Sequence, residues 1–221
     1  MSTTTLNSDK EFTVSKIVCI GRNYARHISE MSAQRTKEPV LFLKPPSAIL
    51  HPGNPILLPP FSSEIHHEIE LALMVSRRAS SIKREEWRSH IAAIGVALDL
   101  TLRDLQQQAK DNGLPWSVSK GFDGSCPVSE FIPLSDHIEP QDLMLKLDVN
   151  GVMKQYGSTS NMIFKIDELF SYISKIFTLE PGDLILTGTP EGVGPLKDGD
   201  RIHMQIDNLV GADFDVKSKL T

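Results

Sequence analysis

The amino-acid sequence predicts an α+β domain in which strands outnumber helices. Short β-rich runs recur along the chain, whereas few segments have helical character. The strands do not alternate regularly with helices, which argues against a doubly wound parallel sheet. A chain of 221 residues suits one large domain or two small ones and is long enough for a substantial core. We expect a polar tail over 1–15 ahead of the folded part.

Alternating or continuous apolar patterns indicate the strands. The main runs are KIVCIG (16–21), PVLFLK (39–44), IHHEIELALMV (65–75), IAAIGVALDL (91–100) and LMLKLDV (143–149). Asn150-Gly151 suits a type I′ turn, so the last run should form a hairpin with VMKQY. PILLPP (55–60) is expected to be an edge strand or a connector. Further strands follow in ILTG, DRIHMQID and ADFDVKS.

Helices are expected over 25–34, 82–90, 101–110 and 161–177. In the third helix, Thr101 is placed to act as the N-cap, and Asp104 would interact favourably with the helix dipole. Apolar residues at helical spacing in the last helix indicate that it packs on a sheet.

Composition and charge argue against several classes of protein. The formal net charge is −5 and basic clusters are absent, which argues against nucleic acid as a partner. No apolar run approaches the ~20 residues needed to span a bilayer. A secretory signal would require an apolar segment, which the N-terminal stretch lacks. Cys19 and Cys126 show no disulfide or zinc spacing, which fits a cytoplasmic protein. Cys19 lies in the apolar run IVCIG, so we expect it to be a buried free thiol.

The stretch HHEIEL (66–71) places two glutamates at the start of an apolar run. Strand alternation puts Glu68 and Glu70 on one face, which becomes apolar at Ala72 and Met74. Like charges near a core repel each other and lose hydration, and a metal ion would remove both penalties. A solvated strand face would also remove them, so both interpretations stay open.

Asp99 is a third carboxylate beside a core, because it ends the run IAAIGVALD. Together with Glu68 and Glu70 it would offer the oxygen ligands that Mg²⁺ or Mn²⁺ prefers. A cap or turn residue is the alternative for an aspartate at a strand end. Lys120, which lies between aromatic residues, is either an anchor for an anion or a surface lysine lying over apolar rings.

Two further polar stretches are candidates for chemistry. Glycines in TGTPEGVG (187–194) let backbone amides face an anion, and Thr187 and Thr189 either donate to a carboxylate or stabilise the turn. In GRNYARHISEM, a helix would place His27 and Glu30 side by side. Such a pair raises the basicity of the imidazole and suits activation of water, although surface pairs of this kind are common.

Taken together, these motifs resemble the fumarylacetoacetate hydrolase family. The matching stretches run in the family's order over about residues 16–200: GRNYARHISEM, EPVLFLKP, HHEIELAL, GVALDLTLRDLQ, GLPWSVSKGFD and ILTGTPEGVGP. The likeness is greatest to the short acylpyruvase and oxaloacetate decarboxylase branch. The resemblance implies a β-rich mixed-sheet roll, a single catalytic domain over 16–221 and a homodimer.

The resemblance also implies roles for individual residues. Three carboxylates would hold Mg²⁺ or Mn²⁺: Glu68, Glu70 and Asp99. A water-activating pair and an active-site cation would carry catalysis: His27, Glu30 and Lys120. Four side chains would bind the substrate: Arg22, Arg103, Gln106 and Thr189. The water-activating pair would lie on a mobile lid formed by residues 25–36.

The expected substrate is a small 2-oxo carboxylate. The expected reaction is metal-dependent hydrolysis of a carbon–carbon bond in an acylpyruvate or related 2,4-dioxo acid, with decarboxylation of oxaloacetate as a further activity of the same site. One alternative is an isomerase or decarboxylase of aromatic catabolism on the same scaffold. The other is a non-catalytic protein that binds a metal or an anion.

Overall fold

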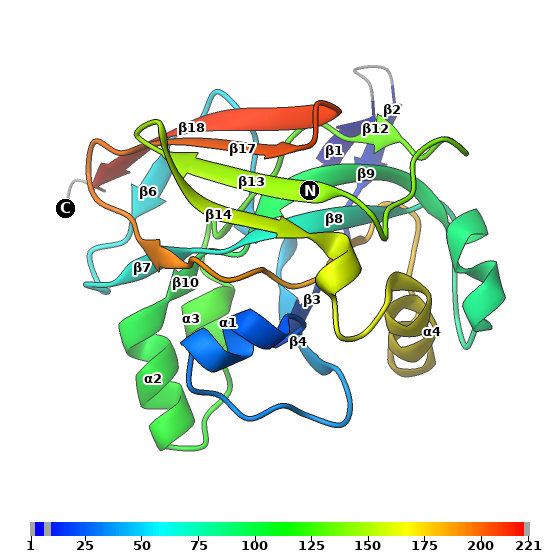
Figure 1. Ribbon diagram of the computed structural model, residues 1–221, viewed down its shortest axis with the longest axis horizontal. Coiled ribbons are helices and arrows are strands. Elements are labelled where there is room, and N and C mark those ends of the chain that lie inside the picture. Colours follow the sequence, from blue (N-terminus) through cyan, green and yellow to red (C-terminus); the bar gives the residue numbers. More distant parts are fainter. Residues whose placement is uncertain (1–2, 7–9, 219–221) are drawn as a thin grey trace.

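The computed structural model describes residues 3–6 and 10–218, and two mixed sheets dominate this part of the chain (Figure 1). The first sheet has the strand order β12 (Ile132–Pro133), β9 (Ile91–Leu98), β8 (Ile69–Val75), β15 (Leu184–Leu186), β3 (Ile17–Gly21) and β4 (Val40–Lys44). The second has the order β14 (Val152–Ser158), β13 (Met144–Val149), β17 (Arg201–Ile206), β18 (Val210–Ser218) and β6 (Ile56–Leu58). The predicted β-rich α+β fold is confirmed.

Strand β8 is buried on both faces, as the alternating pattern predicted. Leu71 and Leu73 point into the larger core, which lies between the two sheets. Ala72 and Met74 point into a second cluster on the opposite face of the first sheet. Cys19 is a buried free thiol, as expected, and so is Cys126. Glu70 therefore enters the sheet on the face that the second cluster covers.

The strand predicted over 65–75 is interrupted at Glu68. Its first part, β7 (Ile65–His67), belongs to a small sheet with the order β10-β7-β16, in which β10 is Thr101–Leu102 and β16 is Gly194–Pro195. Its second part, β8, pairs with β9 and β15 in the first sheet. The junction at Glu68 thus brings together the chain segments that follow β9 and β15.

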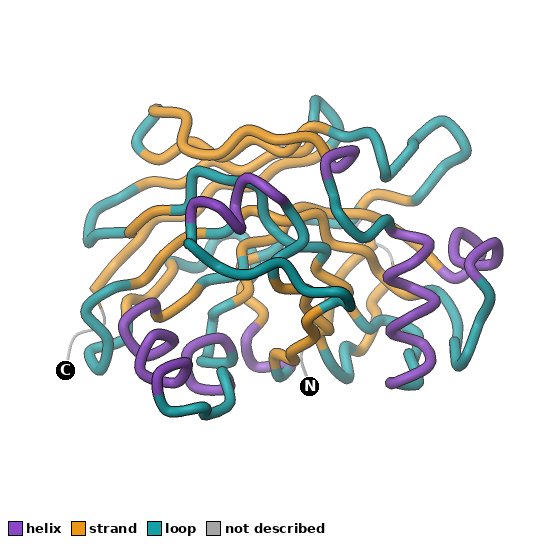
Figure 2. The backbone as a smooth tube through the Cα atoms, turned by 60° about the horizontal axis from the view of Figure 1, so that its bottom comes forward, coloured by secondary structure: helices purple, strands orange, loops and turns teal. Residues whose placement is uncertain are grey.

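Three α-helices lie on one side of the sheets (Figure 1): α1 (Ala25–Glu30), α2 (Arg103–Asp111) and α3 (Ser117–Lys120). Helix α4 (Ile166–Ile176) lies at a distance from these three (Figures 1 and 2). Three short segments are 3-10 helices: η1 (Pro46–Ala48), η2 (Arg84–His90) and η3 (Thr159–Asn161). The predicted cap was wrong: Thr101 belongs to strand β10, and α2 begins only at Arg103. Helix α3 was not predicted.

The predicted hairpin over β13 and β14 is confirmed. Asn150 and Gly151 both have positive φ, at 54° and 76°, as a type I′ turn requires. Within the predicted tail, β1 (Thr3–Leu6) pairs with β2 (Lys10–Thr13). The remaining short strands, β5 (Ile49–Leu50) and β11 (Cys126–Pro127), pair in parallel. Across the described residues, no helix has the length and apolar character to cross a membrane.

Candidate active site

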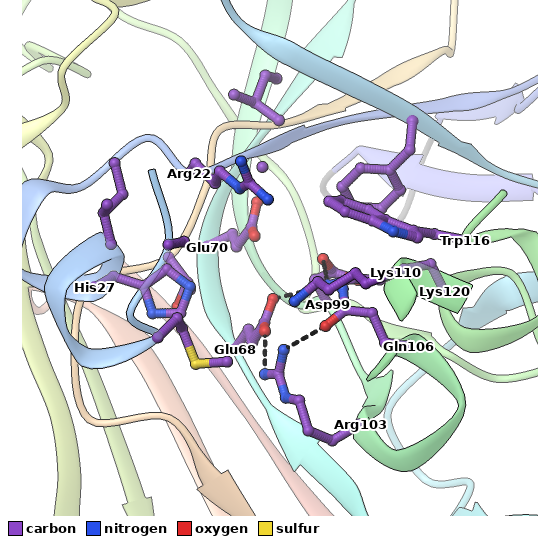
Figure 3. A pocket seen from close by; sticks show the side chains of 17 residues that line it. Arg22, His27, Glu68, Glu70, Asp99, Arg103, Gln106, Lys110, Trp116 and Lys120 are labelled. Atoms are coloured by element: carbon purple, nitrogen blue, oxygen red, sulfur yellow. Dashed lines mark hydrogen bonds and ion pairs between the residues drawn. The ribbon is translucent and has the colours of Figure 1, made fainter. Parts of the chain in front are cut away.

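An open pocket is lined by nearly all of the predicted site residues (Figure 3). All of them except Glu30 line it: Arg22, His27, Glu68, Glu70, Asp99, Arg103, Gln106, Lys120 and Thr189. They come from α1, α2, α3, the junction of β7 with β8, and the segments after β3, β9 and β15. The fold therefore gathers residues that lie far apart in the sequence.

Glu68, Glu70 and Asp99 form a buried carboxylate cluster at the floor of this cavity. One oxygen from each residue lies within 4.8 Å of the other two, and none of the three residues is more than 4% exposed. The backbone amide of Asp99 donates to the carbonyl of Glu68 at 2.8 Å, which holds the end of β9 beside the start of β8. A solvated strand face, the alternative reading of the glutamates, is wrong.

Lys120 supplies the main counter-charge to this carboxylate cluster. Its ammonium donates to Glu68 at 2.8 Å, to Asp99, and to the hydroxyl of Thr101 at 2.6 Å. Burial alone would lower the pKa of Lys120, but the carboxylates of Asp99 and Glu68 outweigh burial and raise it. Lys120 is therefore a buried, charged ammonium, and the alternative of a surface lysine is wrong.

Lys44 is a second buried cation that was not predicted from the sequence. It is fully buried, and its ammonium forms an ion pair with Asp99 Oδ1 at 2.9 Å, at an angle unsuited to a hydrogen bond. The same ammonium donates to the carbonyls of Lys120 and Ser125. The available signal was a lysine that ends the apolar run PVLFLK. Lys44 thus holds Asp99 and α3 in fixed positions.

The two glutamates of the cluster differ in their surroundings. Burial alone would raise the pKa of Glu68, but Lys120 and Arg103 outweigh it and hold that pKa well below its usual range. Burial, Asp99 and Glu68 together raise the pKa of Glu70 well above its usual range. Glu70 accepts a hydrogen bond from the Gly188 amide at 2.6 Å and forms no ion pair with any described residue. Glu70 is therefore the carboxylate that a bound cation would stabilise most.

His27 and Glu30 lie side by side on α1, as their spacing predicted. Nδ1 of His27 lies 3.2 Å from Oε2 of Glu30, and Oε1 of Glu30 accepts a hydrogen bond from the Gly192 amide at 3.0 Å. A carboxylate only accepts hydrogen bonds, so in the neutral imidazole Nδ1 carries the hydrogen and Nε2 holds the lone pair. The arrangement is that of a base oriented by an acid, and the catalytic role stays a prediction.

The candidate substrate-binding residues fall into two groups. Arg103 donates to Gln106 at 2.8 Å and to the carboxylate of Glu68, so these two side chains of α2 are fixed beside the carboxylate cluster. Thr189 accepts a hydrogen bond from Gln155 at 2.8 Å. Thr187 donates to the carbonyl of Leu71 at 3.0 Å and so stabilises the turn.

Lys110 and Trp116 also line the cavity, and neither was predicted as a site residue. The Lys110 ammonium lies 5.8 Å from the centre of the Trp116 ring. Burial, followed by the charges of Arg103 and Arg22, lowers the pKa of Lys110. The helical spacing of Lys110 with Arg103 was the available signal, since the two residues are seven apart on α2.

Three comparisons relate this chain to known proteins. The family model described as "Fumarylacetoacetate (FAA) hydrolase C-terminal" matches residues 16–217. The mouse protein named "Oxaloacetate tautomerase FAHD1, mitochondrial" is 48% identical over 201 residues, which are 91% of each chain.

Solved structures of two enzymes have the same fold. Fumarylpyruvate hydrolase from Pseudomonas aeruginosa, in complex with Mn²⁺ and pyruvate, is 34% identical, with a TM-score of 0.91 over 99% of this chain and 97% of that chain. The 5-carboxymethyl-2-hydroxymuconate delta-isomerase from Mycobacterium smegmatis is 36% identical, with a TM-score of 0.84 over 96% of this chain and 82% of that chain. The protein described here belongs to the fumarylacetoacetate hydrolase family.

Proposed function

We propose that this enzyme stabilises the enol form of small 2-oxo dicarboxylates and that its main reaction is keto–enol interconversion of oxaloacetate. The observation that carries the proposal is the buried cluster of Glu68, Glu70 and Asp99 beside the Lys120 ammonium. The relative named oxaloacetate tautomerase supports this choice of reaction.

The residues of the carboxylate cluster fit a divalent cation. Their donors are all oxygens, which Mg²⁺ and Mn²⁺ prefer. Among the described residues, Glu70 lacks a cationic partner and Oδ1 of Asp99 accepts no hydrogen bond. The Mn²⁺ and pyruvate in the fumarylpyruvate hydrolase complex support the same assignment. When bound, the cation would act as a Lewis acid that stabilises negative charge on the 2-oxo acid.

His27 is the residue best placed to move a proton, because its Nε2 is free while Nδ1 is held by Glu30. Nε2 would remove a proton from C3 of the keto form, and the electron pair of that C–H bond would become the C2–C3 double bond. Negative charge would then develop on the 2-oxo oxygen, where the Lys120 ammonium stabilises it. The imidazolium would then give its proton to that oxygen, which forms the enol and restores the neutral imidazole.

The cations at the cavity wall favour a substrate with two carboxylates. Arg22 and Lys110 line the cavity, and neither forms an ion pair with a described acidic residue. Figure 3 places both around the cavity that holds the carboxylate cluster. A second substrate carboxylate would supply the missing counter-charge. Oxaloacetate and fumarylpyruvate have that carboxylate, whereas acetylpyruvate does not.

A second candidate is hydrolysis of an acylpyruvate, which the His27–Glu30 pair and the fumarylpyruvate hydrolase neighbour favour. Nε2 would take a proton from water, and the resulting hydroxide would add to the distal acyl carbonyl. The bond between that carbon and C3 would break, and its electron pair would leave with pyruvate as the enolate. Decarboxylation of oxaloacetate also gives this enolate but needs no activated water.

A substrate screen tests the proposal. Purified protein with Mg²⁺ is given oxaloacetate, fumarylpyruvate and acetylpyruvate, and loss of the enol absorbance is followed together with formation of pyruvate. We expect rapid approach to the keto–enol equilibrium of oxaloacetate, and little turnover of acetylpyruvate. Cleavage of acetylpyruvate at a higher kcat/KM than oxaloacetate tautomerisation would contradict the assignment.

The homodimer and the cytoplasmic location expected from the sequence stay predictions. Light scattering would test the homodimer.

A further inference from the structure

We propose that Gln155 is a positioning residue that keeps the Thr189 hydroxyl free to donate a hydrogen bond to a carboxylate of the substrate. The inference rests on the proposed function, because it takes Thr189 as a contact of a 2-oxo carboxylate. Gln155 does not line the cavity and lies on β14, a strand of the second sheet. It would therefore act only through Thr189.

The Gln155 amide is fully buried and uses all of its hydrogen-bonding groups. Its Oε1 accepts from the Ile69 amide at 3.0 Å and lies 3.0 Å from Nδ1 of His67. Its Nε2 donates to Thr189 Oγ1 at 2.8 Å and to the Pro190 carbonyl at 2.9 Å. One side chain thus joins β14, the junction of β7 with β8, and the loop that carries Thr189.

The backbone partners determine which way this amide points. The Ile69 N–H can only donate, so it must face Oε1, and the Pro190 carbonyl can only accept, so it must face Nε2. Thr189 Oγ1 therefore receives the second Nε2 hydrogen as an acceptor. Its own hydrogen has no acceptor among the described residues, and Thr189 lines the cavity. The hydroxyl is left as a donor toward the space where a substrate carboxylate would lie.

The strand that carries Gln155 packs directly against the loop over 187–194. A Cβ atom added at Gly157 would lie 2.6 Å from Cβ of Pro190, and one added at Gly192 would lie 2.2 Å from the carbonyl oxygen of Lys154. Only glycine permits this approach at either position. Because Ile69 lies between Glu68 and Glu70, Gln155 also fixes the Thr189 hydroxyl relative to the carboxylate cluster.

A double-mutant cycle tests whether Gln155 acts through the Thr189 hydroxyl. Oxalate affinity is measured by calorimetry, at constant Mn²⁺, for the wild type, Gln155→Met, Thr189→Val and the double variant. Thr189→Val and Gln155→Met should each weaken oxalate binding about tenfold, the scale of one hydrogen bond to a charged group. Adding Gln155→Met to Thr189→Val should change the affinity less than about twofold, because the hydroxyl is already absent.

Gln141→Met is the matched control. Gln141 also joins two segments through its amide, since it donates to the Thr159 carbonyl at 2.6 Å and accepts from the Ile166 amide at 2.8 Å, but it does not line the cavity. It should lower the melting temperature and leave oxalate affinity unchanged. If Gln155→Met weakens oxalate binding equally with and without the Thr189 hydroxyl, the inference is overturned while the proposed function stands. A wild type that binds no oxalate with Mn²⁺ would overturn the proposed function as well.

A measurement on the folded wild type covers the case in which Gln155→Met does not fold. The side-chain NH₂ resonances of Gln155 are followed by NMR with Mg²⁺ and increasing oxalate. We expect them to shift on binding in the wild type, because their acceptor Thr189 forms a new hydrogen bond, and to stay unchanged in Thr189→Val. Unchanged resonances in the wild type would overturn the inference.

Discussion

His27 separates the reactions that one cavity could catalyse. Hydrolysis and tautomerisation both need a base, whereas decarboxylation of oxaloacetate needs only stabilisation of the enolate. We expect His27→Ala to lower kcat/KM for fumarylpyruvate hydrolysis and oxaloacetate tautomerisation by ~10²-fold or more, the scale of losing a general base. Decarboxylation should fall far less. Parallel losses in all three reactions would show that His27 serves binding or closure of the site.

Lys120 acts on a step that all of these reactions share. Negative charge develops on the 2-oxo oxygen each time, and the Lys120 ammonium lies among the buried carboxylates that face the cavity. We expect Lys120→Ala to reduce every reaction by ~10²-fold or more, the scale of losing one preorganised electrostatic contact. Thermal unfolding with excess Mg²⁺ serves as the control for folding. A variant that keeps one reaction at wild-type kcat/KM would exclude the shared role.

At the scale of single elements, Asp104 fastens the first turn of α2 to the chain before β7. Its carboxylate accepts hydrogen bonds from Ser62 and Ser63 and from the Leu105 amide. Burial alone would raise the pKa of Asp104, but these hydrogen bonds outweigh burial and lower it. The folded protein therefore holds this carboxylate in its charged form more firmly than the unfolded chain does.

The sign of the resulting pH dependence follows from that lowered pKa. The stabilisation is fully present above the pKa of an unfolded aspartate and disappears as pH falls through the lowered folded pKa. We expect Asp104→Asn to reduce the free energy of unfolding at neutral pH by about 1 kcal/mol, a value discounted because the carboxylate is partly exposed to solvent. Urea unfolding at decreasing pH should show the gap to wild type closing. A gap that is constant with pH would contradict the account.

Helix α1 carries the predicted lid over 25–36. Residues 25–30 of this segment are helical, and Arg26 and Glu30 connect α1 to the loop over 187–194 through Glu191 and the Gly192 amide. These contacts are few, so we expect the segment to open readily without substrate. Oxalate with Mg²⁺ should slow proteolysis within 25–36. Equal cleavage rates with and without oxalate would show that no lid closes here.

At the scale of the whole molecule, local pattern predicted the strand-rich α+β fold but not its division into two main sheets. The alternation of Leu71 and Leu73 with Ala72 and Met74 correctly assigned both faces of β8. The break at Glu68 was not predictable, because it arises where two sheets compete for the hydrogen bonds of one strand. Similarly, pairing with β7 draws residue 101 into a strand and removes it from the start of α2.

The residues that line the candidate site were predictable from the sequence, but the residues that hold them in position were not. The carboxylates, Lys120 and His27 lie in compact motifs that a sequence displays directly. Lys44 lies 55 residues from Asp99 in the sequence. Gln155 lies 34 residues from Thr189 and 86 residues from Ile69. Long-range contacts of this kind leave no local pattern.

The central claim is that Glu68, Glu70 and Asp99 hold a divalent cation on which activity depends. The most direct test compares Mn²⁺ binding and oxaloacetate tautomerisation in the wild type, Glu70→Gln and the control Glu64→Gln, an exposed glutamate that pairs with His66. We predict one Mn²⁺ per chain and chelator-sensitive activity in the wild type and in Glu64→Gln, with both lost in a folded Glu70→Gln. Wild-type activity that survives complete removal of metal, or a Glu70→Gln variant that binds Mn²⁺ and turns over oxaloacetate normally, would contradict the account.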